Sequence, residues 1–322
     1  MNDKHDGTKW KSIAQQSMDL LFLTRLQPIM KLSNGDPNIA IGVIDGPVNL
    51  SHPDFRESKI RTVKDSQFIA CKNASSIACI HGTFITGILA AKRDGNAPAI
   101  CPNCQIILYP IFKDNAVTNI NFNNNNNIVN TDGIIIFPTS TPKELSNAII
   151  QTIDAGAKII NLSLELSSSS LVTFAEIEEA YDYACQNDVI IVAASGDQGN
   201  VGSFPLLNHP WVIPVAACDD NGFPLCQSNF GPSIANRGLM APGVNVTSTS
   251  STGQYIHISG TSVAAPFVTG TIALLWSLFP NASTSQIVYS IKRSSNTIRR
   301  RTIIPPLLNS EKAYEVLKKM II

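Results

Sequence analysis

The chain has 322 residues, of which 44% are hydrophobic and 15% charged, and its 24 Lys and Arg balance 24 Asp and Glu. This composition is typical of a globular protein, and zero net charge gives no support for nucleic acid or a membrane as partner. No apolar run reaches the roughly 18 residues that span a bilayer.

The N-terminus, MNDKHDGTKWKS, lacks the apolar core and cleavage site of a signal peptide, so the sequence predicts a cytoplasmic protein. Residues 38–45, NIAIGVID, read as a buried strand that ends at Asp45 before a Gly-Pro turn. Residues 81–91, HGTFITGILAA, have helical spacing and place His81 at a helix start. A strand is expected at 106–112, and the Asn-rich segment 114–130 reads as an exposed loop.

Strands and helices alternate in the second half of the chain. Capping boxes at Thr141–Glu144 and Ser283–Gln286 mark two helix starts. Further helices are expected at 173–187 and 311–321, and strands at 158–164, 189–194 and 211–217. Apolar strands that alternate with amphipathic helices predict a largely parallel sheet covered on both faces, in a single α/β domain.

Three polar side chains occupy special places in this scheme. Asp45 ends a buried strand, and parallel sheets hold their sites at such strand ends. His81 begins a helix of small residues, and Ser262 begins the apolar helix of GTSVAAPFVTG. A serine there projects from a fixed backbone beside unpaired N–H groups, which suits a nucleophile at an oxyanion hole. Taken singly, Asp45 also fits a turn cap and Ser262 a helix N-cap.

The order Asp, His, Ser, within IGVIDG, HGTFITGILAA and GTSVAAPFVTG, resembles the subtilisin-like serine proteases, the subtilase family. The resemblance runs from about residue 17 to 320, and implies a three-layer α/β fold with a largely parallel central sheet. Residues 17–322 would then form the catalytic domain, after an N-terminal extension at 1–16.

The resemblance also implies roles for the three residues. Ser262 would attack the peptide carbonyl, His81 would transfer the proton, and Asp45 would orient His81, without a cofactor. The oxyanion hole would involve Asp197 and the Ser262 N–H. The expected substrate-binding residues are Ser163, Leu164, Glu165, Ala194, Ser195 and Gly196. We find no defensible calcium loop and predict no metal site.

Two residues depart from the family pattern. Asp197 stands where the family usually has an asparagine that donates to the oxyanion. An ionised carboxylate cannot donate, so we hypothesise that burial and the oxyanion keep Asp197 protonated when substrate is bound; the alternative is an ionised residue and a slow enzyme. Glu165 stands where a glycine is common, and either favours a basic substrate residue or is a solvated loop charge.

The segments DGPVNLSHPDF and CPNCQIILYPIF resemble proteases that mature ribosomal peptide natural products, the cyanobactin type in particular. Residues 1–37 are too short for a signal peptide and an inhibitory prodomain together. We therefore expect a serine endopeptidase that removes a leader from a precursor peptide. The alternatives are a general intracellular protease and a catalytically weak protein that binds peptides.

The seven cysteines leave three interpretations open. Cys101-Pro-Asn-Cys104 has the spacing of a redox or metal motif, and Cys71 and Cys79 would complete four ligands. Unpaired thiols, a disulfide and a structural zinc site all remain compatible with the sequence.

Overall fold

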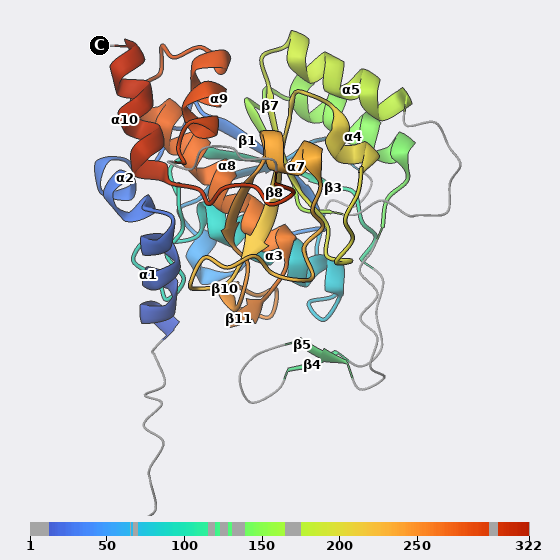
Figure 1. Cartoon of the computed structure of the whole chain (residues 1–322). Coiled ribbons are helices and arrows are strands. Elements are labelled where there is room, and N and C mark those ends of the chain that lie inside the picture. Colours follow the sequence, from blue (N-terminus) through green and yellow to red (C-terminus); the bar gives the residue numbers. More distant parts are fainter. Residues whose placement is uncertain are drawn as a thin grey trace, which may run out of the picture.

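The centre of the protein is a seven-stranded sheet in which every pairing is parallel (Figure 1). The structure, a computed structural model, describes residues 13–64, 66, 70–114, 120–122, 128–130, 139–164, 175–295 and 302–321. The strands, in spatial order, are β2 (Lys59–Thr62), β3 (Gln105–Pro110), β1 (Ala40–Asp45), β6 (Ile159–Leu162), β7 (Ile190–Ala194), β8 (Val212–Cys218) and β9 (Leu239–Pro242). The predicted parallel sheet is confirmed.

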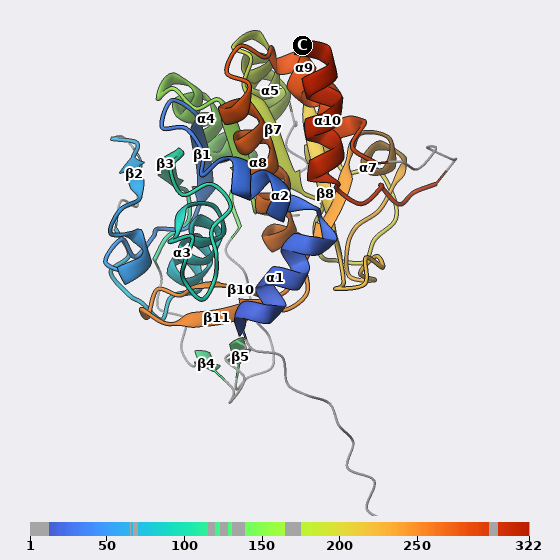
Figure 2. The ribbon, with the colours of Figure 1, turned by 90° about the vertical axis from the view of Figure 1, so that its left-hand side faces the viewer.

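Helices cover both faces of this sheet, which gives three layers (Figures 1 and 2). One face packs against α4 (Pro142–Asp154), α5 (Ala175–Gln186), α6 (Pro205–Asn208) and α7 (Pro232–Arg237). The other face packs against α3 (Ile77–Ala90) and α8 (Thr261–Leu278). Outside these two lie α1 (Ile13–Leu23), α2 (Leu26–Leu32), α9 (Thr284–Lys292) and α10 (Ser310–Ile321).

Burial on both faces explains the apolar strands at the centre. Every residue of β1, β6, β7 and β8 is buried, whereas the edge strand β2 has no buried residue. The order of the strands reverses between β1 and β6, and a site in such a sheet commonly lies at the carboxyl ends of the strands near this point.

Helix α8 is the apolar core helix of the protein. Its 18 residues have a mean hydropathy of 1.4, and 83% of the helix is buried. Among the described residues it is the one helix with the length and composition to cross a membrane, a test that the core helix of a globular domain also passes. It begins where the sequence predicted, beside Ser262.

Both predicted capping boxes form. The Thr141 hydroxyl accepts from the Glu144 N–H at 3.2 Å, and Ser283 accepts from the Gln286 N–H at 3.3 Å. In each case the side chain of the third helical residue reaches back to the N–H of the cap residue. These local signals therefore located two helix starts correctly.

Several elements differ from the prediction. The segment expected as a loop at 114–130 contains an antiparallel pair, β4 (Ile120–Phe122) and β5 (Ile128–Asn130). A second antiparallel pair, β10 (Val246–Thr249) and β11 (Tyr255–Ile258), and the 3-10 turn η1 (Pro53–Phe55) were not foreseen. Helix α1 begins before residue 17, so it crosses the predicted boundary of the N-terminal extension.

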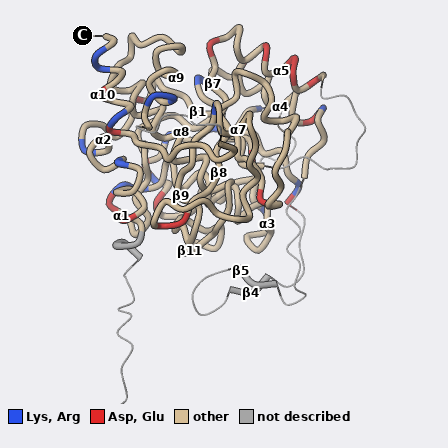
Figure 3. Tube along the Cα trace, viewed as in Figure 1, with Lys and Arg blue, Asp and Glu red and all other residues tan. Residues whose placement is uncertain are grey.

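Charged residues of both signs are spread along the described chain (Figure 3). Acidic residues occur along α5, including Glu176 and Glu178 in its first turn, and basic residues end α10.

Candidate active site

Asp45 and His81 form a buried pair at the carboxyl end of β1. The His81 Nδ1 lies 2.8 Å from the Asp45 Oδ1, and the exposed fractions of the two residues are 7% and 1%. The Gly46 N–H donates to the same Oδ1 at 2.6 Å. A carboxylate only accepts hydrogen bonds, so the proton resides on Nδ1 and leaves Nε2 available as a base.

Glycines bring β1 and α3 close enough for this contact. A Cβ on Gly46 would overlap the Ala78 carbonyl, and a Cβ on Gly82 would overlap the Gly46 carbonyl. Helix α3 begins at Ile77, so His81 lies in its second turn and not at its start, as the sequence had predicted. The helix start was missed because residues 77–80 are apolar and Ser76 makes no side-chain cap hydrogen bond.

Two carboxylates affect the pKa of the His81 imidazole. Burial by itself would lower the pKa of His81, but the charge and hydrogen bond of Asp45 outweigh it. The charge of Asp197 adds to the same effect, so the pKa of His81 is raised above its ordinary value. Both carboxylates thus favour the cationic form of His81.

Ser262 lies in the first turn of α8, and its backbone is held from outside the helix. Pro266 has no N–H, so the Ser262 carbonyl four residues earlier loses its usual helical partner. The Ser163 hydroxyl, just after β6, donates to that carbonyl at 2.7 Å. Asn161 donates to Ser163 at 2.8 Å, and Thr269 of α8 donates to Asn161 at 2.8 Å. This chain ties the candidate nucleophile to the sheet.

Replacing Ser163 with alanine is expected to destabilise the protein by about 1–3 kcal/mol, because two buried polar groups lose their partner. It should also lower kcat, since the first turn of α8 is no longer fixed. Urea unfolding and peptide kinetics measure the two effects. Ser75→Ala, which removes an exposed hydroxyl, is the matched control. Equal stability of both variants would contradict the role given to Ser163.

Asp197 caps the helix that carries Ser262. Its Oδ1 accepts from the Thr261 N–H at 2.8 Å, and its Oδ2 accepts from the Thr261 hydroxyl at 3.1 Å. Gly260 has a φ of 141°, and a Cβ there would lie 2.9 Å from the Asp197 Oδ2. Glycine at this position therefore allows the chain before Thr261 to approach Asp197 closely.

The surroundings of Asp197 do not support the predicted protonated form. The residue is exposed, so it does not have the buried setting on which the hypothesis depended. Hydrogen bonds donated to both carboxylate oxygens favour the ionised form, as does the N-terminus of an α-helix. These contacts suit an ionised Asp197 in the protein without substrate, and protonation in the substrate-bound protein stays a prediction.

A cavity of about 410 Å³ opens beside these groups. Both His81 and Ser262 line it, and so does Asp197. Much of its wall is apolar and comes from Phe112, Leu164, Ala194, Leu225 and Val244. These residues follow or end strands of the sheet, so the cavity lies at the carboxyl ends of the strands.

Most of the predicted substrate-binding residues line this cavity. Ser163, Leu164, Ala194 and Gly196 line it. Ser195 does not line the cavity, and it is buried. Glu165 lies outside the described residues. Seven lining residues were not predicted, three of them apolar, and they are Phe112, Leu225, Gln227, Val244, Ser259, Gly260 and Thr261.

Two of the three open interpretations each hold for some of the cysteines. Cys71 and Cys79 form a disulfide, whereas Cys101 and Cys104 are buried free thiols. The four-cysteine zinc site is therefore wrong, since Cys101 and Cys104 do not lie with Cys71 and Cys79, which are bonded to each other.

Comparisons with known proteins fit this geometry. A sequence profile of the subtilase family matches residues 36–305. The thermophilic serine proteinase of Bacillus sp. (strain AK1) is 30% identical over 247 residues, which are 76% of this chain and 53% of that protein. Fervidolysin of Fervidobacterium pennivorans is 31% identical over 274 residues, or 78% of this chain and 36% of that protein. The chain thus spans about half or less of the length of these relatives.

Solved structures match more of the chain. The protease domain of PatA, a mutant form, has a TM-score of 0.75 and 28% identity, and covers 89% of this chain and 97% of its own. The prenylagaramide maturation protease PagA has a TM-score of 0.74 and 27% identity, and covers 91% of this chain and 98% of its own.

Proposed function

The chain belongs to the subtilase family, and on that premise we propose that it is a serine endopeptidase with Ser262 as nucleophile. His81 is the general base, and Asp45 orients it. The observation that carries this assignment is the buried Asp45–His81 contact of 2.8 Å at a cavity that Ser262 also lines.

The geometry supports a role for each of the three residues. Nε2 of His81 takes the Ser262 proton as the hydroxyl attacks the peptide carbonyl, and the Asp45 carboxylate stabilises the resulting imidazolium. The proton then passes to the leaving amine, and water releases the acyl-enzyme by the same steps. The Ser262 N–H, in the first turn of α8, has no partner within the helix and would serve as an oxyanion donor.

The substrate is a peptide whose backbone lies along the segments after β6 and β7. Peptides commonly bind such clefts as an added strand, with side chains received by pockets. The apolar wall beside Ser262 suits an apolar substrate side chain. This differs from the preference for basic residues that Glu165 suggested, a residue outside the described part of the chain.

We extend the proposal to removal of a leader from a precursor peptide. It is supported by the similarity to PagA, named as a maturation protease, at 27% identity over most of both chains. The alternative is a general intracellular protease. A cytoplasmic location remains a prediction, and the Cys71–Cys79 disulfide is a bond more typical of oxidising compartments.

A fluorophosphonate probe tests the activated serine directly. Wild type should be labelled, and Ser262→Ala should not be labelled while it folds equally well. Incubation with a precursor peptide and mass spectrometry then tests the substrate, for which one cleavage after the leader is expected. Cleavage at many sites would favour the general protease instead.

A second candidate function rests on Asp197. An ionised carboxylate beside the oxyanion position opposes the charge that develops there. A protein that binds peptides and cleaves them weakly is consistent with this feature. Peptide binding without labelling of the folded wild type would favour it.

A further inference from the structure

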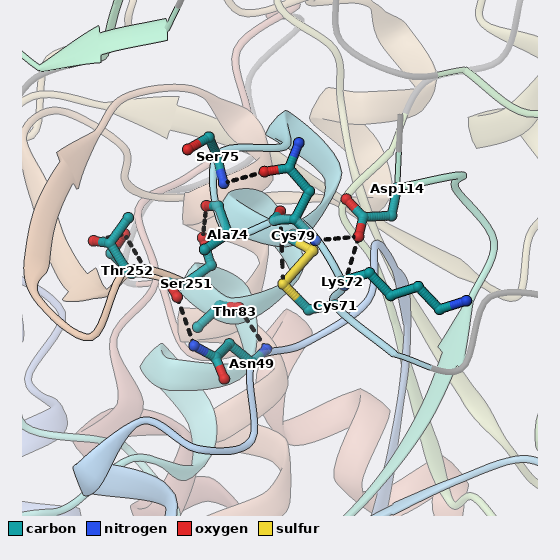
Figure 4. Close-up of a disulfide and its surroundings, with 12 residues drawn as sticks. Asn49, Cys71, Lys72, Ala74, Ser75, Cys79, Thr83, Asp114, Ser251 and Thr252 are labelled. Carbon is teal, nitrogen blue, oxygen red and sulfur yellow. Dashed lines mark hydrogen bonds between the residues drawn. A yellow bond between two sulfur atoms is a disulfide. The ribbon is translucent and has the colours of Figure 1, made fainter. Parts of the chain in front are cut away.

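Beside the start of α3, the Asp114 carboxylate lies close to the Cys71–Cys79 disulfide, so three potential metal ligands are near one another (Figure 4). The sulfurs of Cys71 and Cys79 and a carboxylate oxygen of Asp114 lie within 4.8 Å of one another. Cys101 and Cys104 do not belong to this group. The group is separate from the cavity that Ser262 lines.

Asp114 is held in place by one oxygen and offers the other. Its Oδ2 accepts from the Lys72 N–H at 2.6 Å and from the Asn73 N–H at 2.7 Å. Its Oδ1 is buried and makes no hydrogen bond among the described residues. A buried carboxylate oxygen without a partner is costly, and a cation would satisfy it.

The surrounding loop is fixed independently of the disulfide. The Ser251 hydroxyl donates to the Ala74 carbonyl at 2.5 Å, and Asn49 donates to the Ser251 carbonyl at 2.5 Å (Figure 4). The Asn73 carbonyl oxygen lies 3.8 Å from the Cys71 sulfur and adds a further oxygen at the site. Opening the disulfide would therefore leave the ligands near one another.

We propose that Cys71, Cys79 and Asp114 form a redox-gated site for Zn²⁺ or a similar divalent cation. In the oxidised protein the two sulfurs are bonded to each other and cannot bind the metal as thiolates. In the reduced protein two thiolates and a carboxylate bind the metal, a ligand set that suits zinc.

The chemistry balances as two steps. A dithiol gives two electrons and two protons to the disulfide, and itself becomes a disulfide. Binding of Zn²⁺ then forms two zinc–sulfur bonds and releases both thiol protons. Cys71 is half-buried and Cys79 fully buried, so attack by the reductant on Cys71 is the accessible route.

The disulfide and the proposed metal site would each hold the loop before α3 against the first turn of that helix. Cys79 belongs to the first turn of α3, the helix that carries His81, and Cys71 belongs to the loop before it. The metal would restore under reducing conditions the link that the disulfide provides under oxidising ones. The proposed site does not depend on the proposed protease activity.

Cobalt(II) is the probe, because thiolate ligation gives a charge-transfer band that needs no activity assay. The purified protein is reduced with a phosphine, which is oxidised to its oxide with the oxygen of water. Thiol titration after denaturation verifies that the disulfide has opened. We expect one equivalent of cobalt, displaced by Zn²⁺, in the reduced protein and no band in the oxidised protein.

The oxidised protein is itself a control, since its five free cysteines are already thiols. Asp114→Asn is the decisive variant, because it is purified with its disulfide formed and its folding is checked before reduction. Losing a group that only orients a ligand costs about 10- to 100-fold in affinity, so loss of this ligand should cost at least that. Cys226→Ser, which changes an exposed cysteine, should bind like wild type.

Three results would overturn the proposal. They are no cobalt band in verified reduced protein, an equal band in the oxidised protein, and unchanged affinity in Asp114→Asn. Failure of fluorophosphonate labelling would concern the protease proposal alone.

Discussion

Replacing Asp45 with asparagine is expected to lower kcat for peptide hydrolysis by about 10⁴-fold, the magnitude known for this change in another serine protease. The Asp45 Oδ1 lies 2.8 Å from the His81 Nδ1, and both residues are buried. Without the charge, the imidazolium that forms as Ser262 attacks loses its main stabilising partner. An asparagine amide turned toward His81 would also favour the wrong tautomer.

The same substitution has a signed effect on pH dependence. Asp45 is the largest cause that raises the pKa of His81, so its removal lowers that pKa. His81 must be neutral to act as a base, and the acidic limb of kcat/KM against pH should therefore move to lower pH. In this variant the maximal rate should fall and the acidic limb of the pH profile should move to lower pH.

A second histidine–carboxylate pair offers a matched control. His209 Nε2 lies 3.2 Å from Asp182 Oδ1, and neither residue lines the cavity beside Ser262. Asp182→Asn makes the same chemical change and should leave kcat and the pH profile unchanged. A loss in Asp45→Asn no greater than in this control would remove Asp45 from the mechanism.

The sequence predicted features that depend on local patterns. Strands β1, β6, β7 and β8 were recognisable because every residue in them is buried, which makes the run apolar. The capping boxes at Thr141 and Ser283 located two helices. The motifs around Asp45, His81 and Ser262 placed three residues at one site, and their resemblance to a family implied the roles.

Features that depend on distant segments could not be predicted. The wall of the cavity joins Phe112, Leu225 and Val244, which approach one another only in the folded sheet. Spacing alone did not decide between a disulfide and a metal site for Cys71 and Cys79. The environment of Asp197 depends on its contact with Thr261, 64 residues away, which no local pattern in the sequence indicates.

Replacing Asp197 with asparagine is therefore expected to raise kcat. In subtilisin, a member of the same family, removing one oxyanion donor costs about 10²–10³-fold, and the substitution should recover part of such a loss here. Asparagine supplies an amide donor and removes a negative charge from the developing oxyanion. It also caps helices about as well as aspartate, so α8 should keep its start.

Asp197→Ala separates the two contributions. Both variants remove a charge that raises the pKa of His81, so both should move the acidic limb to lower pH, by less than Asp45→Asn does. Only the asparagine variant gains a donor, and only its plateau rate should rise. The alanine variant also loses the cap to Thr261, which should cost about 0.5–2 kcal/mol of stability in urea unfolding. An asparagine variant no faster than wild type at any pH would show that Asp197 does not stand at the oxyanion position, and the peptide-binding function would then lose the feature on which it rests.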